Sequence, residues 1–245
     1  MSHIVITGGS GKVGSHIVRS LLDKNYNVTS ISRSGKKVFT NEIFQELNEV
    51  KLDVTKEKDF EDLICIQNKR FGPVTGLINC CSYRPMNKSM DDHISKWKDS
   101  ILQNSLSLFV PTRICIKNMI KNKVEGSIIT ISSIYGIVAP RFDIYNEMDF
   151  ESEPDYSYNK FAAVGFTKYI ASYYSKNNIR ANIIAPGGFF NNQPKKFVSN
   201  YTKNTLLGRM AEGDDICGVI NFLLNNDSKY ITGSVISMDG GWTCV

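Results

Sequence analysis

Apolar residues along the chain follow two alternating periods. Short runs rich in β-branched residues are each followed by a longer segment in which apolar residues recur at helical spacing. The short runs predict strands over 3–7, 27–32, 50–54, 76–80, 126–132, 178–186 and 234–239. The longer segments predict helices over 13–24, 155–177 and 214–224, one from an N-cap at Thr55 to Lys69, and two within 91–123.

The repeated alternation of strand and helix predicts the fold class. A strand, a crossover helix and a second parallel strand form a right-handed unit, and a series of such units builds a doubly wound parallel sheet with helices on both faces. The run 126–132 is apolar on both faces, as a central parallel strand should be. No internal repeat or change of composition marks a boundary, so we expect a single α/β domain over residues 1–245.

Composition and charge exclude several classes of protein. Of the 245 residues, 42% are hydrophobic and 22% are charged, an ordinary globular balance for one large core. The longest apolar runs are four or five residues, far short of the roughly 18–20 that span a bilayer, and the opening MSHIVITGG lacks a secretion signal. The net charge of +5 comes from scattered basic residues, which argues against a nucleic-acid partner. We therefore expect a cytoplasmic protein that has no membrane segment.

The six cysteines do not form a recognisable framework. Cys80 and Cys81 are adjacent and no C-x-x-C pair occurs, which suits neither a set of disulfides nor a zinc site. We expect free thiols in a reducing compartment and no metal site.

A glycine-rich turn joins the first strand to the first helix. The segment TGGSGKVG (7–14) allows a tight turn, and the helix that follows offers free N–H groups and a partial positive charge to a pyrophosphate. A glycine-rich segment alone also fits a plain turn. In this strand–turn–helix context it predicts a Rossmann-like dinucleotide site whose contacts are Gly8, Ser10, Gly11, Lys12, Val13 and Gly14.

The end of the second strand discriminates between the two nicotinamide cofactors. An acidic residue there binds the ribose 2′-OH of NAD, whereas an arginine accommodates the 2′-phosphate of NADP. This chain has Ser32 followed by Arg33, and Lys12, Lys36 and Lys37 add positive charge. The pattern favours NADP (NADPH) and leaves NAD possible; the alternative is a solvated basic turn.

Tyr156 and Lys160 form the candidate catalytic pair. They are four residues apart on an expected helix, so both side chains lie on one face. A neighbouring ammonium group favours the phenolate form of a tyrosine, which can then exchange a proton with an alcohol or carbonyl oxygen. The helix follows the fifth strand, whose carboxyl end carries Ser132 and Ser133, and ligands of parallel sheets bind outside such ends.

In these motifs, and in their order and spacing, the chain resembles the short-chain dehydrogenase/reductase family over essentially its whole length. Besides the glycine turn, Asp53 and YSYNK, the resemblance is carried by LINCC (77–81), QNSLSLF (103–109), ISSIYG (131–136), RANIIAPGG (180–188), GRMAEGDDI (208–216) and YITGSVISMDGG (230–241). It implies an NAD(P)-dependent oxidoreductase that interconverts a CH–OH group and a carbonyl.

The resemblance also implies catalytic roles at matching positions. Tyr156 would be the general acid/base, and Lys160 would support it and bind the nicotinamide ribose. Ser133 would hold the substrate oxygen, and Asn104 would support a proton relay through water. Each position has a plainer alternative, since Ser133 also fits a helix or turn cap and Asn104 a satisfied core amide.

Further residues would contact the cofactor. Asp53 and Val54 would contact the adenine, and Asn79 would brace the sheet beside the cofactor. Pro186 and Gly187 would lie along the nicotinamide, and Phe189 would be a further cofactor contact. The Pro-Gly pair also fits a mere turn.

Two departures from the family pattern keep other functions open. Lys12 stands at a usual glycine position, which gives a loop typical of extended sugar epimerases and dehydratases, although only 59 residues follow Pro186 to build their substrate domain. A non-enzymatic, NAD(P)-sensing regulator on the same fold is the other alternative. Such regulators typically lose the tyrosine or lysine of the catalytic pair, and both are present here.

The segment between Ser133 and Tyr156 is longer than is usual in the family. The extra residues, 141–154, form an insertion that carries five carboxylates and three aromatic side chains. A long loop beside a site is more often functional than idle. We expect a lid that selects the substrate, and the alternative is a solvated surface insertion.

Three segments, SIYGIVAPRFDIYN (133–146), NNQPKKF (191–197) and YRP (83–85), together resemble a narrower group, the oxidoreductases of bacterial surface-sugar and flagellin modification. That resemblance implies a sugar phosphate or nucleotide sugar as the small-molecule substrate, in carbohydrate biosynthesis, with Arg84, Lys88 and Arg141 as candidate phosphate partners. The family also implies a homotetramer or homodimer in which the helices 101–122 and 156–177 pair across subunits.

Overall fold

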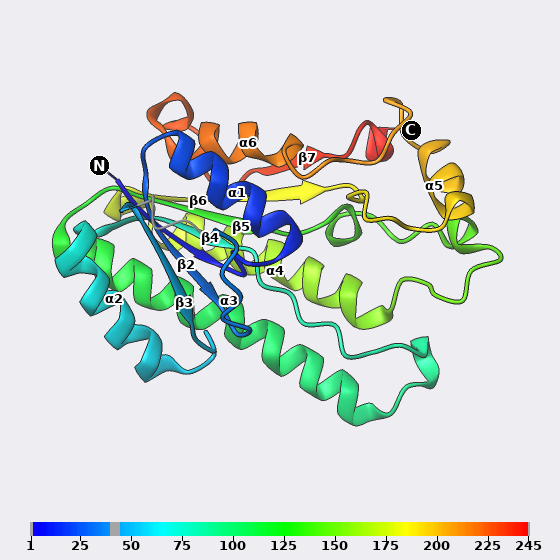
Figure 1. Ribbon diagram of the computed structural model, residues 1–245, viewed down its shortest axis with the longest axis horizontal. Coiled ribbons are helices and arrows are strands. Elements are labelled where there is room, and N and C mark those ends of the chain that lie inside the picture. The colour runs from blue at the N-terminus through cyan, green and yellow to red at the C-terminus, as the bar shows by residue number, and fades with distance from the viewer. Residues whose placement is uncertain (1, 40–44, 245) are drawn as a thin grey trace.

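A seven-stranded parallel sheet organises the computed structural model, which describes residues 2–39 and 45–244. The expected domain over 1–245 thus includes Met1, 40–44 and Val245, which lie outside the described residues. The strand order is β3-β2-β1-β4-β5-β6-β7 (Figure 1). The strands are β1 (His3–Thr7), β2 (Asn27–Ser32), β3 (Leu47–Lys51), β4 (Val74–Asn79), β5 (Gly126–Ile131), β6 (Ile179–Pro186) and β7 (Val235–Met238).

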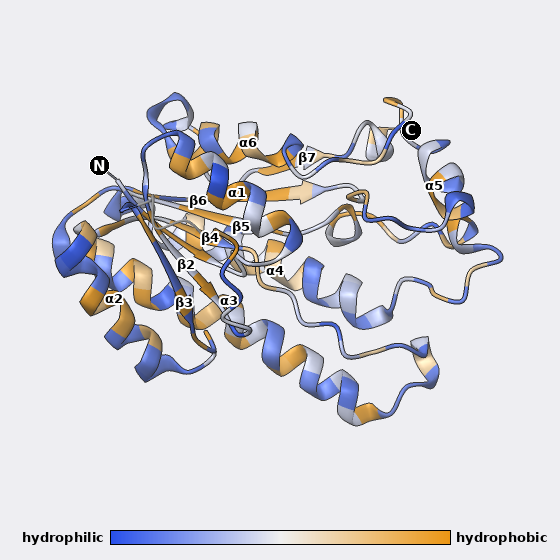
Figure 2. Ribbon diagram, viewed as in Figure 1, coloured by the Kyte–Doolittle hydropathy of each residue, from blue (hydrophilic) through white to orange (hydrophobic). Residues whose placement is uncertain are grey.

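Helices cover both faces of the sheet, as the sequence predicts (Figure 1). One face carries α1 (Lys12–Asp23) and α6 (Asp215–Leu224), and the other carries α2 (Glu57–Phe71), α3 (Ile94–Asn122) and α4 (Pro154–Tyr173). Side chains alternate along each buried strand, so that Val5 faces the second group of helices while Ile4 and Ile6 face the first. The central strands therefore carry apolar side chains toward both groups of helices, and their ribbons are largely orange in Figure 2.

The order of the strands creates a crevice. β1 pairs with β2 on one side and with β4 on the other, so the chain reverses its direction of winding between these two neighbours. In open α/β sheets this reversal separates the loops at the carboxyl ends of the strands, and ligands bind between them. The single-domain, doubly wound α/β fold is confirmed.

Three local predictions were wrong. The third strand is Leu47–Lys51 and not 50–54, and Lys56, not Thr55, is the N-cap of α2. Thr55 instead donates from its backbone N–H and its hydroxyl to the Asp53 carboxylate, at 3.0 and 2.8 Å. The stretch 91–123 holds one 29-residue helix, α3, which continues through Pro111.

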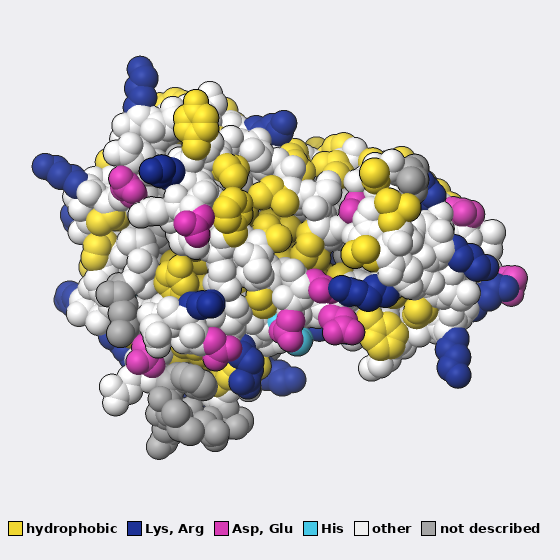
Figure 3. Space-filling model, turned by 90° about the horizontal axis from the view of Figure 1, so that it is seen from above, with side chains coloured by type: hydrophobic (Ala, Val, Ile, Leu, Met, Phe, Trp, Pro, Cys, Tyr) yellow, Lys and Arg dark blue, Asp and Glu magenta, His cyan; other side chains and the backbone are white. Residues whose placement is uncertain are grey.

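One helix, α5 (Lys195–Thr202), was not predicted. It buries only Phe197 and Tyr201, and polar residues surround these two positions, so the segment has the composition of a loop. No helix in the described part of the chain is long and apolar enough to cross a bilayer. On the surface seen from above in Figure 3, Lys and Arg alternate with Asp and Glu rather than gathering in one patch.

Candidate active site

A cavity of about 840 Å³ occupies the crevice at the carboxyl ends of the strands. Segments that follow six different strands line it, which explains how residues far apart in the sequence meet there. Most of the predicted site residues line this cavity: Gly8, Ser10, Gly11, Lys12, Val13, Gly14, Ser32, Arg33, Asp53, Val54, Ser133, Tyr156, Lys160, Pro186, Gly187 and Phe189.

The two predicted asparagines lie elsewhere. Asn79 and Asn104 line a smaller cavity of about 310 Å³, which Tyr156 and Lys160 also border. The Asn79 amide donates to the Thr112 hydroxyl at 3.0 Å. Asn104 accepts from the backbone N–H of Tyr83 at 3.0 Å and donates to the carbonyl of Tyr83 at 2.8 Å. Both residues thus brace the loop and helix beside the main cavity, and a direct cofactor contact by Asn79 stays a prediction.

The glycine turn is built for close approach of a ligand to the backbone. Gly8 has a positive φ of 75°, and a Cβ at Gly14 would lie 2.2 Å from the Gly8 carbonyl oxygen, so no other residue fits at position 14 without rearrangement. Gly11 is the N-cap of α1 and provides no side-chain hydrogen bond to the helix. The first N–H groups of α1 are therefore available to an anion in the cavity, which fits a dinucleotide pyrophosphate.

Lys12 reaches across the mouth of the cavity. Its ammonium group donates to the carbonyl of Phe190 and to the side-chain oxygen of Asn191, the latter at 2.6 Å. It thus ties the glycine turn to the segment after β6, a contact that the sequence did not indicate.

Arg33 and Asp53 line the end of the cavity nearest β2. The Arg33 guanidinium lies 5.2 Å from the centroid of the Tyr83 ring. Burial alone would raise the pKa of Asp53, but hydrogen bonds from Thr55 and the charges of Arg33 and Lys56 lower it below its usual value. Asp53 is therefore a carboxylate. Lys36 and Lys37 are exposed and do not line the cavity.

Tyr156 and Lys160 lie on the first turns of α4, where Pro154 begins the helix. The Lys160 ammonium is 5.6 Å from the centroid of the Tyr156 ring and donates to the Ile131 carbonyl at 3.0 Å. The Ser132 hydroxyl donates to the Lys160 carbonyl at 2.9 Å, which fixes the start of α4 against the end of β5. The two predicted catalytic residues are thus held on one side of the cavity.

Ser133 caps a turn at the wall of the cavity, and its contact with the substrate stays a prediction. It is 6% exposed and lines the cavity, while its hydroxyl oxygen accepts from the backbone N–H of Tyr135 at 3.2 Å and caps a short 3₁₀ turn (Ile134–Gly136). The hydroxyl proton remains free to point at a substrate oxygen, because the cap uses only the oxygen as acceptor.

The insertion 141–154 is packed and forms part of the cavity wall. Ile144 is 1% exposed and belongs to a third apolar cluster, which joins the insertion to α5 and to Trp242. Tyr145 and Ser152 line the cavity. The insertion is therefore more than a solvated loop, and its role in substrate selection stays a prediction.

Two of the three candidate phosphate partners lie outside the cavity. Arg141 donates to the Asn204 side chain at 2.5 Å and lies over the Trp242 ring, and Lys88 is exposed. Arg84 does line the cavity, with its guanidinium 4.4 Å from the centroid of the Tyr156 ring.

Tyrosines that sequence reasoning missed also line the cavity. The hydroxyls of Tyr135 and Tyr145 are 3.3 Å apart, and Tyr201 accepts from the backbone N–H of Gly188 at 2.5 Å. Burial raises the pKa of all three, to about 12 for Tyr201. These hydroxyls are therefore neutral hydrogen-bonding groups. Tyr135 lies within the ISSIYG segment (131–136), directly after Ser133, whereas no sequence motif marks Tyr145 and Tyr201, which the insertion and α5 bring to the site.

The cysteines at the end of β4 are not poised for nucleophilic chemistry. Burial raises the pKa of Cys80 to about 12, and it also raises that of Cys81. A protonated thiol is a poor nucleophile. All six cysteines are free.

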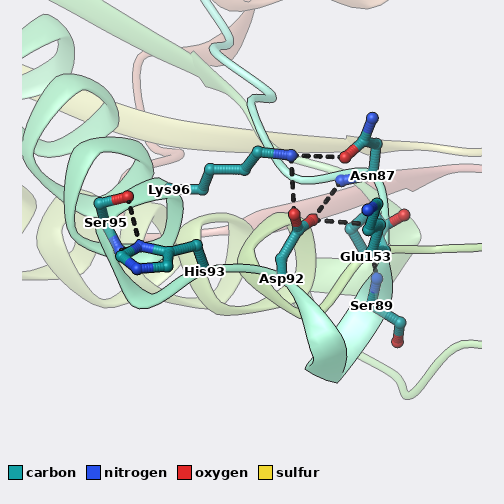
Figure 4. A network of polar contacts seen from close by, with 8 residues as sticks. Asn87, Ser89, Asp92, His93, Ser95, Lys96 and Glu153 are labelled. Carbon is teal, nitrogen blue, oxygen red and sulfur yellow. Dashed lines mark hydrogen bonds and ion pairs between the residues drawn. The ribbon is translucent and has the colours of Figure 1, made fainter.

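A polar network holds the loop between β4 and α3 (Figure 4). The Asp92 carboxylate accepts from the backbone N–H groups of Asn87 and Lys88 and pairs with Lys96 at 2.7 Å. Glu153, at the end of the insertion, accepts from the backbone N–H of Ser89 at 2.6 Å. The loop that carries Arg84 and the insertion that carries Tyr145 are thus linked.

The chain is similar to known proteins over nearly its whole length. The sequence model of the enoyl-(acyl carrier protein) reductase family matches residues 10–243. Post-translational flagellin modification protein A of Campylobacter coli is 30% identical, over 98% of this chain and 97% of that protein. The 3-oxoacyl-(acyl-carrier-protein) reductase FabG of Buchnera aphidicola is 31% identical, over 97% and 95% of the two chains.

Solved structures share the fold. A short-chain dehydrogenase from Leptospira borgpetersenii, solved with bound NAD+, has a TM-score of 0.90 at 29% identity, over 99% of this chain and 92% of that one. ElxO, solved with NADP, has a TM-score of 0.85 at 24% identity, over 100% and 99% of the two chains. The same fold thus holds either cofactor.

Asp92 provides a test of the loop network by pH. Its partner Lys96 and the two backbone N–H groups hold its pKa at about 2, below the value of about 4 in an unfolded chain. A depressed carboxyl pKa adds stability above the unfolded value, and that stability is lost as the pH falls through the folded value. At neutral pH the wild-type protein should therefore have a higher melting temperature than the Asp92→Asn variant. The difference in melting temperature should disappear as the pH falls from about 4 to about 2. A difference in melting temperature that does not change with pH would contradict this; the exposed Asp149, changed to Asn, is the control.

Proposed function

The chain belongs to the short-chain dehydrogenase/reductase family and is an NAD(P)-dependent dehydrogenase/reductase, and we propose that it uses NADP(H) to interconvert a carbonyl and a secondary alcohol. The observation that carries the proposal is the position of Tyr156 and Lys160. Both line the cavity that the uncapped N-terminus of α1 also lines. A nicotinamide bound there would supply or take up the hydride.

The protein side chains supply the proton and the orientation. In the direction of reduction, Tyr156 donates its hydroxyl proton to the carbonyl oxygen while the carbonyl carbon takes up the hydride; oxidation reverses both transfers. The Lys160 ammonium, held by the Ile131 carbonyl, lies 5.6 Å from the centroid of the Tyr156 ring and attracts the negative charge that is left on Tyr156. Ser133 donates its hydroxyl to the substrate oxygen and fixes its position beside Tyr156.

Tyr156→Phe tests the catalytic assignment. Because the ring is kept and only the proton donor is lost, NADPH binding should change by less than about twofold, while kcat should fall by about 100- to 10,000-fold. Fluorescence titration and NADPH oxidation measure the two quantities. Tyr158→Phe, which alters an exposed tyrosine on the same helix, is the matched control. Normal turnover by Tyr156→Phe would exclude this tyrosine as the general acid, and unchanged biological activity without turnover would favour a cofactor-sensing regulator.

Arg33 supports the preference for NADP(H). The end of β2 carries Ser32, Arg33 and Ser34 at the cavity, and the nearest carboxylate, Asp53, is already bonded by Thr55. A 2′-phosphate placed here would meet a cation and hydroxyl donors, whereas a ribose 2′-OH would lack the usual acidic acceptor.

The preference is measurable by titration with both reduced cofactors. NADPH should bind at least about 10-fold more tightly than NADH, and Arg33→Ala should bring the two dissociation constants to within about threefold. Lys36→Ala, which removes an exposed charge outside the cavity, should leave the preference unchanged. Tighter binding of NADH by wild type would show that Arg33 has another role.

The surface of α3 and α4 supports self-association. These two helices pack together through Phe109 and Phe166 and expose a row of large apolar side chains: Leu102, Phe109, Phe161, Tyr169 and Tyr173. We propose that a second copy covers this surface in a homodimer or homotetramer.

Light scattering tests the assembly. The mass should be two or four times 27.5 kDa, and Phe161→Glu should shift it toward the monomer because a charge would be buried in the interface. Ile66→Glu, at an exposed apolar position of α2, should leave the mass unchanged. A wild-type monomer at micromolar concentration would rule out the proposed interface.

The proposal also includes a class of substrate. Similarity to the flagellin modification protein along the whole chain supports a role in surface-glycan biosynthesis in the cytoplasm, with a sugar phosphate or nucleotide sugar as substrate. A panel of carbonyl sugars offered with NADPH tests this class, and activity confined to uncharged, non-sugar ketones would contradict it.

A further inference from the structure

We propose that Arg84 binds an anionic group of the substrate, a carboxylate or a phosphate ester, a few bonds from the reacting carbonyl. The proposal rests on the oxidoreductase function given above and assigns a residue and a charge to its substrate. The observation behind it is that the Arg84 guanidinium lies 4.4 Å from the centroid of the Tyr156 ring and lines the main cavity.

The loop presents Arg84 in a fixed place. The residue before it, Tyr83, is held by both its backbone N–H and its carbonyl through Asn104, and its hydroxyl donates to Asp99 at 2.8 Å. Asn104 and Asp99 both lie on α3, so the loop is anchored to that helix. The cation is thus directed over the catalytic ring by a braced backbone, and little further ordering is needed when an anion binds.

No carboxylate neutralises Arg84. Among residues 2–39 and 45–244, Arg84 forms no ion pair, and Asp53 is the only carboxylate that lines the cavity. The acidic side chains of the insertion do not line the cavity. Glu147 pairs with Lys196 at 3.2 Å, Glu153 binds the Ser89 N–H, and the remaining ones are exposed: Asp143, Asp149 and Glu151.

The two lysines of the cavity have hydrogen-bond partners of their own. Lys160 donates to the Ile131 carbonyl and Lys12 to the segment after β6, whereas Arg33 contacts the ring of Tyr83 much as Arg84 contacts that of Tyr156. Among the described cations that line the cavity, Arg84 is the arginine that lies over the catalytic ring, and no hydrogen bond occupies its N–H donors. An arginine offers five N–H donors in a planar arrangement that matches carboxylate and phosphate oxygens.

Tyr145 supplies a second donor from the opposite wall. Burial raises the pKa of Tyr145 despite the opposing charge of Arg84, so its hydroxyl keeps its proton. The hydroxyl also contacts that of Tyr135 at 3.3 Å. An anion between the β4–α3 loop and the insertion would therefore meet a charge and a neutral hydroxyl. Because Arg84 lies against the ring that exchanges the proton, the anion must be close to the carbonyl.

Two matched pairs of ketones test the proposal. Dihydroxyacetone phosphate is compared with dihydroxyacetone, and acetoacetate with its methyl ester, so that each pair differs mainly in the charge. Binding to the enzyme loaded with NADPH is measured by calorimetry, and turnover is measured by NADPH oxidation. Wild type should favour the charged member of at least one pair by about 10- to 100-fold, which also distinguishes phosphate from carboxylate.

Variants test whether the preference for the charged ketone depends on Arg84. Arg84→Met should reduce the preference to within about threefold, Arg84→Lys should restore part of it, and Tyr145→Phe should weaken it less. Lys88→Met removes an exposed charge of the same loop outside the cavity and should leave the preference intact.

The outcomes separate this proposal from the proposed function. Equal binding of charged and neutral members, a preference that survives in Arg84→Met, or no detectable binding of either anion would overturn the role of Arg84. Reduction of neutral and charged ketones alike would support the oxidoreductase activity and still overturn the anion site. Anion binding that depends on Arg84 without any turnover would support the site and contradict the activity.

Discussion

The chemistry of the site depends on the packing of α4 against the end of β5. Three polar contacts hold these elements together: Ser132 to the Lys160 carbonyl, Lys160 to the Ile131 carbonyl, and Thr167 to the Thr130 hydroxyl at 2.8 Å. Gly136 permits the approach, since a Cβ there would lie 2.8 Å from the Lys160 carbonyl oxygen. Ser133 on one element and Tyr156 on the other thereby keep a fixed relation, and the sheet, not a mobile loop, sets it.

Much of the fold could be predicted from the sequence, because every strand except β3 and most helices carry their own periodic signal. The errors arose in segments whose secondary structure depends on tertiary contacts. Pro111 suggests a break, yet the buried side chains on both sides of it keep α3 continuous. The α5 segment buries two aromatic residues only because the insertion and Trp242 cover them. Periodicity within a short window contains no information about such partners.

The residues of the candidate site can also be divided into those that the sequence reveals and those that only the tertiary structure reveals. Residues that belong to local motifs, such as the glycine turn and the Tyr156–Lys160 pair, could be recognised because their chemistry depends on neighbours in sequence. Arg84 could be named only as a basic residue, and Tyr145 only as part of an insertion. Their approach to Tyr156 follows from how two crossover connections fold over the sheet, which the sequence pattern does not specify.

The bond between the Glu153 carboxylate and the Ser89 N–H has a consequence for how this enzyme could diverge. It joins the two connections that line the cavity beside Tyr156. Glu153 is also the N-cap of α4, and its carbonyl accepts from the backbone N–H of Tyr156 at 3.2 Å. A change in the length or sequence of one connection therefore acts on the other and on the start of the catalytic helix. We expect new specificities to arise through paired changes in both connections that keep this helix start in place.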